Sequence, residues 1–215
     1  RGKPPFDKLS TRIPGELTGN VVMGRGLEHF TDGLAQVFAG MARALKPGGP
    51  LAFTYHHNAL DAYYPVAVAI LDAGLTCSAS LPCPGEMGGS IHINGTGSSI
   101  IDTVFVCRST GSVPRRWVVE DRESFRRLVN DDVSLLRAGG VSPTRGDIRC
   151  ISFGHLIRLA VWTLRHEWDR NATVSQKLKK VDGMASRFGS WQELETLLGD
   201  TIKDAPPRQW ALAME

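Results

Sequence analysis

Three adjacent side chains, Tyr55, His56 and His57, are the clearest candidates for chemistry in the sequence. The stretch from residue 44 to residue 57 predicts a helix end, a Pro-Gly-Gly turn, a short apolar strand and then this polar cluster. In open α/β sheets, ligands and catalytic groups collect beyond the carboxyl ends of strands. The position therefore predicts a binding or catalytic site. The alternative is that one histidine only caps the helix that follows.

A glycine-rich loop supplies a second group of candidates. Glu86 lies at its start, and His92 and Asn94 lie within it, between two expected strands. Glycines allow backbone amides to come close to a phosphate or a base, so such a loop can bind either of them. The alternative is a solvent-exposed loop that binds no ligand.

Charged residues elsewhere complete the set. Glu16 and Arg25 precede the first expected helix, where they can contact a substrate or simply pair with each other. Arg108, Arg115 and Arg116 open the most basic stretch of the chain. Arginines there can contact DNA phosphates, which would make binding depend on salt. The alternative is a solvated helix face, because acidic residues follow closely.

The composition is that of an ordinary globular protein. The chain has 215 residues, of which 42% are hydrophobic and 22% charged, and a formal net charge of +3. This mildly basic balance permits a nucleic-acid partner without requiring one. The cysteines have no C-x-x-C spacing, so we expect no metal site and a cytoplasmic location. No apolar run is long enough for a membrane span, so we expect no membrane partner.

Hydrophobic periodicity and turn residues predict an α/β fold, with a helical second half. In the first half, helix, strand, helix and strand are followed by a loop and a last strand, at residues 31–46, 50–55, 58–74, 75–81 and 100–107. The first two strands should be parallel because a helix joins them, and the last should insert antiparallel. The first strand is apolar enough to be buried on both faces, and Pro65 should bend the second helix.

Further helices are expected beyond a basic linker, at residues 121–138, 147–166, 173–188 and 191–199. Ser190 and Glu193 form a capping-box pattern at the start of the last of them.

Several short motifs follow one another along the chain, at residues 16–17, 25–30, 45–49, 53–57, 81–87, 98–99 and 105–108. Together they resemble the C-terminal half of large, adenine-specific DNA methylases. Residues 143–147 look like the start of that family's downstream helical region. The order of helices and strands is similar to the closing half of a class I S-adenosylmethionine-dependent methyltransferase.

The resemblance implies the closing half of a Rossmann-like methyltransferase sheet, followed by a helical C-terminal region. The implied parts are an extended arm or loop at residues 1–27, a partial methyltransferase α/β domain at residues 28–110 and a helical region at residues 111–215. It also implies S-adenosylmethionine as cofactor, DNA as partner and the exocyclic amine of adenine as target. Substrate-pocket residues would be Tyr55, His56, His57, Glu86 and Glu16; nucleic-acid contacts would be Arg25, His92, Asn94, Arg108, Arg115 and Arg116.

Two motifs of that family are missing from these 215 residues: the cofactor-binding glycine motif and the catalytic Asp/Asn-Pro-Pro-Tyr/Phe motif. We therefore expect the chain to be inactive alone. An upstream methyltransferase segment or self-association should complete the sheet, because three strands leave an edge exposed.

Two other functions remain open. One is a non-catalytic module of the same fold that binds nucleic acid or a protein partner. Salt-sensitive DNA binding without cofactor binding would favour this function. The other is an unrelated enzyme that acts on a small molecule through His56 and His57.

Overall fold

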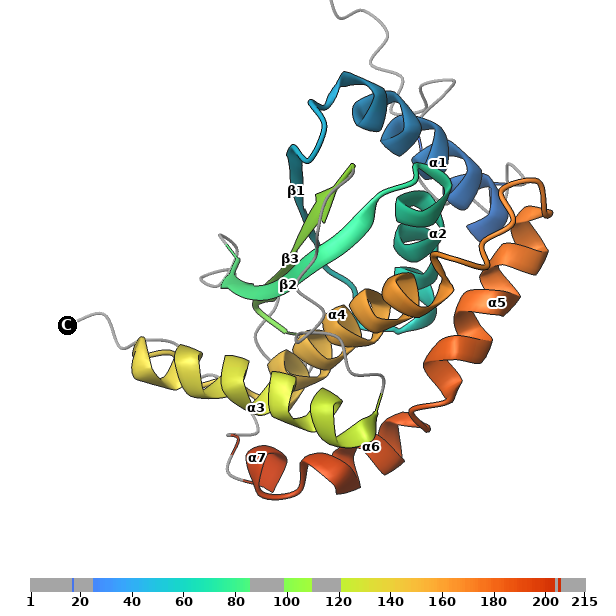
Figure 1. Ribbon diagram of the computed structural model, residues 1–215. Coiled ribbons are helices and arrows are strands. Elements are labelled where there is room, and N and C mark those ends of the chain that lie inside the picture. The colour runs from blue at the N-terminus through green and yellow to red at the C-terminus, as the bar shows by residue number, and fades with distance from the viewer. Residues whose placement is uncertain (1–16, 18–24, 86–98, 110–120, 204, 206–215) are drawn as a thin grey trace, which may run out of the picture.

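The computed structural model describes residues 17, 25–85, 99–109, 121–203 and 205. A three-stranded sheet and a set of helices make up this part of the chain (Figure 1). In chain order the elements are α1 (Leu27–Ala44), β1 (Pro50–Tyr55), the 3₁₀ turn η2 (Asp61–Tyr63), α2 (Tyr64–Asp72), β2 (Thr76–Pro84), β3 (Ile101–Arg108), α3 (Arg122–Ala138), α4 (Arg145–Leu164), α5 (Val174–Ser186), α6 (Trp191–Leu198) and α7 (Asp200–Lys203).

The two helices of the first half differ from their expected form at their N-terminal ends. Helix α1 begins at Leu27 rather than near Thr31, whose hydroxyl lies inside the helix and donates to the Leu27 carbonyl at 2.6 Å. Helix α2 begins only after the turn η2, so Pro65 falls in its first turn and does not bend it. A proline is tolerated there because the backbone N–H that it lacks would have had no partner inside the helix.

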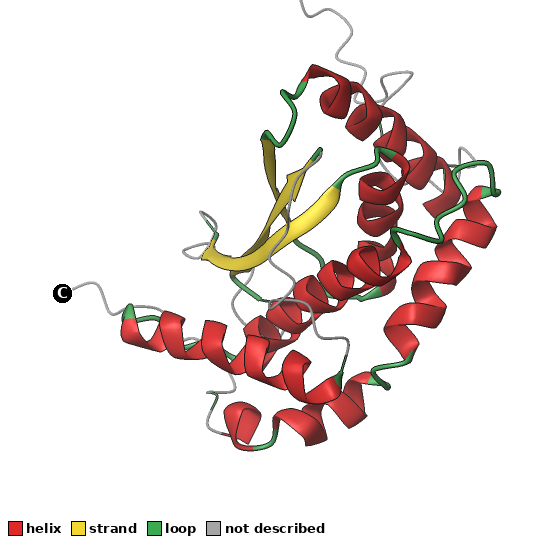
Figure 2. Cartoon of the chain, viewed as in Figure 1, coloured by secondary structure: helices red, strands yellow, loops and turns green. Residues whose placement is uncertain are grey.

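The sheet has the strand order β1-β3-β2 (Figure 2). Strand β3 runs antiparallel to both neighbours, with Phe53 opposite Phe105 and Cys77 opposite Cys107. Strands β1 and β2 therefore point in the same direction, although they do not pair with each other. The expected directions, with a reversed last strand inserted between two others, are confirmed.

One face of the sheet carries helices, and among the described residues the other does not (Figure 1). Phe38 of α1 packs edge-on against Phe53 at 4.8 Å, and α2 and α4 also contact this inner face. On the outer face, Ala52 and Thr54 are exposed. The expectation that the first strand is buried on both faces was therefore wrong, because β1 lies at an edge and is covered on one side only.

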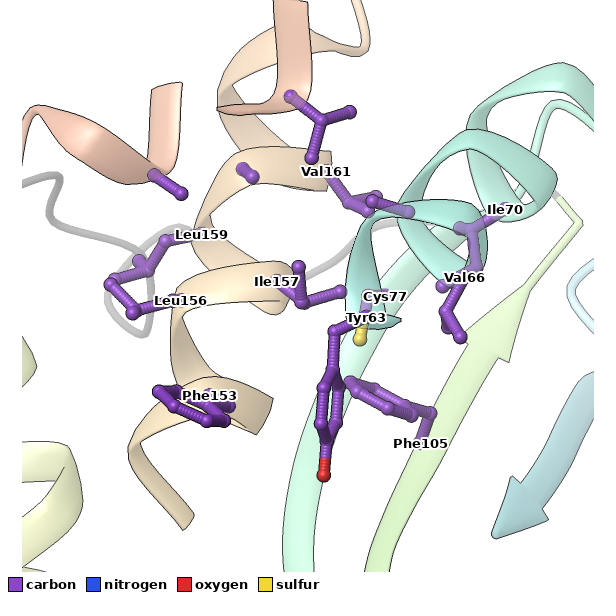
Figure 3. Packing of buried hydrophobic residues seen from close by; sticks show 14 of the residues in the cluster. Tyr63, Val66, Ile70, Cys77, Phe105, Phe153, Leu156, Ile157, Leu159 and Val161 are labelled. Carbon is purple, nitrogen blue, oxygen red and sulfur yellow. The ribbon is translucent and has the colours of Figure 1, made fainter. Parts of the chain in front are cut away.

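The core lies between the inner face and helices α2 and α4 (Figure 3). Tyr63 and Phe105 are fully buried in it, and Phe153 of α4 contacts the Tyr63 ring edge-on at 5.8 Å. Helix α4 comes very close to the sheet at Gly154, where a Cβ atom would lie only 2.7 Å from the Thr103 methyl group. The C-terminal helices thus share one core with the sheet, and the domain boundaries stay predictions.

Helix α5 and the segment that precedes it are attached to α2 by polar contacts, one side chain from each. Lys177 donates to the Asp72 carboxylate at 2.9 Å, and the Trp168 indole donates to the same carboxylate at 2.8 Å. At the start of α6, the capping box between Ser190 and Glu193 is present, which confirms its prediction. Among the described helices, none combines the length and apolar character that crossing a membrane requires.

Candidate functional site

The candidate site lies where β1 ends and β3 begins, on the outer face of the sheet. His56 directly follows β1, and its Nδ1 atom is 3.0 Å from the carbonyl oxygen of Ile101. The same nitrogen is 3.5 Å from a carboxylate oxygen of Asp102, with the His56 and Asp102 side chains 32% and 36% exposed. An imidazole, a carboxylate and solvent access therefore occur together at this point.

The surroundings of His56 fix its tautomer. A carbonyl oxygen can only accept a hydrogen bond, so Nδ1 must carry the proton that is shared with Ile101. The Asp102 carboxylate on the same side favours the same arrangement. In the neutral ring the lone pair is then on Nε2, which can accept a hydrogen bond from a ligand.

His57 has a different role. Its Nδ1 accepts a hydrogen bond from the backbone N–H of Ala59 at 3.0 Å, as a local cap of the turn before η2. Its backbone N–H donates to the Tyr63 hydroxyl at 3.4 Å, and its carbonyl accepts from the Cys150 thiol at 3.6 Å. Burial raises the pKa of that thiol, which keeps it neutral. His57 thus orders the chain behind the site.

Tyr55 does not share the site with His56. Its hydroxyl donates to the carbonyl of Ala62 at 2.7 Å, and its ring packs edge-on against Tyr63 at 4.9 Å. Burial, with a smaller effect of Asp61, raises the pKa of the Tyr55 hydroxyl. Successive strand residues point to opposite faces, which places Tyr55 on the inner face. Tyr55, expected among the substrate-pocket residues, therefore lies on the opposite face of the sheet from His56.

Asp102 and two neighbours were not recognised in the sequence. Cys83 of β2 is paired with Asp102 across the sheet and is exposed. A Cβ atom on Gly85 would lie 3.2 Å from an Asp102 carboxylate oxygen, so only glycine leaves Asp102 undisturbed there. Strand alternation in residues 101–107 could have placed Asp102 outward, but its proximity to His56 depends on the register of β3.

A buried carboxylate, Asp147, holds the backbone next to the site in place. Asp147 accepts hydrogen bonds from the Ser99 hydroxyl at 2.7 Å and from the backbone N–H of Ile100 at 2.9 Å. Its other oxygen accepts from the backbone N–H and the hydroxyl of Thr144, both at 2.8 Å, in a capping box at the start of α4. Asp147 thereby holds the start of β3, and with it the carbonyl of Ile101, against helix α4.

The arginine candidates are largely engaged in local structure where they are described. Arg108 donates from its guanidinium to the carbonyl of Gly48 at 2.9 Å, which ties the end of β3 to the turn before β1. Arg25 lies directly before Gly26, the N-cap of α1. The other candidates lie outside the described residues: Glu16, Glu86, His92, Asn94, Arg115 and Arg116.

The described residues do not form a metal site. They contain no group of three His, Cys, Asp or Glu side chains that could hold a metal ion. Rossmann-like sites, which the sequence resemblance implies here for S-adenosylmethionine, use a glycine loop that leads from a strand into a helix. In the described chain the glycines with positive φ all follow helices: Gly48, Gly74, Gly140, Gly189 and Gly199. The described residues therefore supply no glycine loop of this kind for S-adenosylmethionine, and we derive no step through it.

Comparison with known proteins found no similarity: no family model, no curated protein and no solved structure matches the chain.

Proposed function

We propose that this chain is the closing half of an S-adenosylmethionine-dependent DNA methyltransferase that acts on the exocyclic amine of adenine. The observation that carries the proposal is the sheet: β1 and β2 point the same way, a helix connects them, and the last strand is inserted between them in the opposite direction. Two of the methylase-like motifs, at residues 53–57 and 105–108, overlap β1 and β3.

The free edge of β1 also supports the proposal. In the described residues β1 pairs with β3 on one side and with no strand on the other. An unpaired edge leaves backbone N–H and C=O groups available for a further strand. The glycine loop and the Asp/Asn-Pro-Pro-Tyr motif would be supplied from that side, by another segment or polypeptide, because the 215 residues hold neither.

A comparison of two proteins tests this function. One is the 215-residue chain, and the other is the gene product at its natural length. Each is incubated with S-adenosylmethionine labelled in its methyl group and with DNA that lacks methylated adenine, and the DNA is then digested to nucleosides. We expect labelled N6-methyladenine with the natural-length protein and none with the 215 residues.

The outcomes separate the alternatives. A natural-length protein that neither binds S-adenosylmethionine nor methylates DNA would overturn the proposal. If that protein retained DNA at low salt and released it as salt rose, a non-catalytic nucleic-acid module would replace the methyltransferase. Methyl transfer by the 215 residues alone would show that the missing motifs are not needed.

A further inference from the structure

We infer that Nε2 of His56 accepts a hydrogen bond from the exocyclic amine of a nucleic-acid base, and that Asp102 is the residue that positions it. The inference rests on the proposed function and specifies the chemical group that this site recognises. It concerns how the base is bound, and it involves only residues of this chain.

The direction of the hydrogen bond follows from the tautomer. Nδ1 of His56 is committed as a donor by the Ile101 carbonyl at 3.0 Å, with the Asp102 carboxylate at 3.5 Å beside it. A neutral imidazole with a protonated Nδ1 offers only a lone pair at Nε2. The site therefore favours a partner that donates a hydrogen bond.

This preference divides the bases into two groups. Adenine and cytosine carry exocyclic amines that donate, whereas the corresponding positions of guanine and thymine are carbonyl oxygens that accept. An accepting oxygen against Nε2 would place two lone pairs against each other. At this position of the base edge, a neutral His56 thus favours the amine of adenine or cytosine over the carbonyl oxygen of guanine or thymine.

The described part of the chain leaves His56 accessible on the outer face. The His56 side chain is 32% exposed, and the outer face around it carries no described helix. His57, in contrast, uses its Nδ1 as an acceptor for Ala59 and holds its own turn. The two neighbouring histidines therefore make a matched pair for mutation.

Cys83 provides a reporter for occupancy of this face. It is exposed and pairs with Asp102 across the sheet, whereas the other cysteines, Cys77, Cys107 and Cys150, are buried. A maleimide should therefore modify Cys83 selectively. A base bound at His56 should slow that modification, which peptide mass spectrometry measures at this single position.

The experiment uses the full-length protein and two single-stranded oligodeoxynucleotides of equal length. One contains adenine, and the other contains purine, which lacks only the exocyclic amine. Single strands avoid the cost of extruding a base from a duplex. We expect the adenine strand to protect Cys83 at about tenfold lower concentration, the effect of one hydrogen bond.

Two variants identify the acceptor. His56→Asn keeps an N–H for the Ile101 carbonyl but has no acceptor at the position of Nε2, so both strands should protect Cys83 equally. His57→Asn keeps an acceptor for the Ala59 N–H and should behave as wild type. Equal protection by both strands in the wild type, or no protection by either, would overturn the inference, as would a preserved adenine preference in His56→Asn.

Asp102 is tested by rescue. Asp102→Ala removes the carboxylate and should reduce the adenine preference, whereas Asp102→Asn retains an accepting oxygen and should restore most of it. Preference that is unchanged in Asp102→Ala would remove Asp102 from the inference. Methyl transfer by a wild-type protein that shows no adenine preference would refute the role of His56 and leave the proposed function intact.

Discussion

Replacing Asp147 should destabilise the protein more than any exposed cap, because this carboxylate is fully buried and accepts four hydrogen bonds. Two donors are hydroxyls, which can rotate to other partners. The other two are the backbone N–H groups of Ile100 and Thr144, which cannot. A buried donor that is left without a partner costs about 1–3 kcal/mol.

The expected losses follow from this count. Asp147→Ala leaves both amides unpaired, so the free energy of unfolding should fall by about 4 kcal/mol. Asp147→Asn keeps one accepting oxygen and turns its NH₂ group toward the other amide, so the fall should be about 2 kcal/mol. Gln176→Ala removes a comparable capping box at the exposed start of α5 and should cost about 1 kcal/mol.

Urea unfolding of the full chain, followed by circular dichroism, measures all three values. The slope of free energy against urea should stay constant, so that the midpoints report stability alone. The reasoning would be refuted if Asp147→Ala cost no more than Gln176→Ala. Asp147→Asn must also lie between wild type and Asp147→Ala, because it leaves one backbone amide without an acceptor and Asp147→Ala leaves two.

Three further predictions concern packing, charge and pH. Gly154→Ala should cost about 1–3 kcal/mol because its Cβ would meet Thr103 at 2.7 Å. Gly183→Ala, with open space around it, should stabilise α5. Thermal unfolding that ranks the two variants in the opposite order would contradict the close contact at Gly154. Lys177→Ala should cost about 3 kcal/mol because it removes the charge partner of the largely buried Asp72 carboxylate and leaves it only the Trp168 indole. The exposed Lys203→Ala should have no measurable effect in the same denaturant assay. Burial raises the pKa of the Cys150 thiol above 9.0. The buried neutral thiol therefore contributes stability below that pH, and this contribution is lost as the pH rises through the raised pKa. A free energy of unfolding that does not decrease over this pH range would contradict the prediction.

Local sequence signals predicted most of the elements. The strand at residues 50–55 has its expected bounds, and the helix expected at 121–138 is observed as α3, Arg122–Ala138. Apolar periodicity and the glycines that stop helices are local properties, and they were sufficient here. The start of α1 was missed because no side chain caps it, and because Thr31, which lies inside the helix, is of a residue type common at N-caps.

The candidate site was predictable only as a location. The sequence pointed to the end of β1, but it could not distinguish His56 from His57. Their difference depends on the carbonyl of Ile101, which lies 45 residues away in the chain, and on the N–H of Ala59, two residues away. Which imidazole nitrogen is occupied follows from strand register, and register is a tertiary property.

The strand order has a consequence for how the chain folds. The middle strand, β3, is the last of the three to be synthesised, and both other strands of the described sheet pair with it alone. Residues 50–84 therefore leave the ribosome before any of these interstrand ladders can form. The ladder between β1 and β3 joins Pro50 to Arg108, a non-local contact of the kind that slows folding. Until residue 108 is available, the apolar strands need protection from other chains, so this part of translation is when a chaperone would matter most.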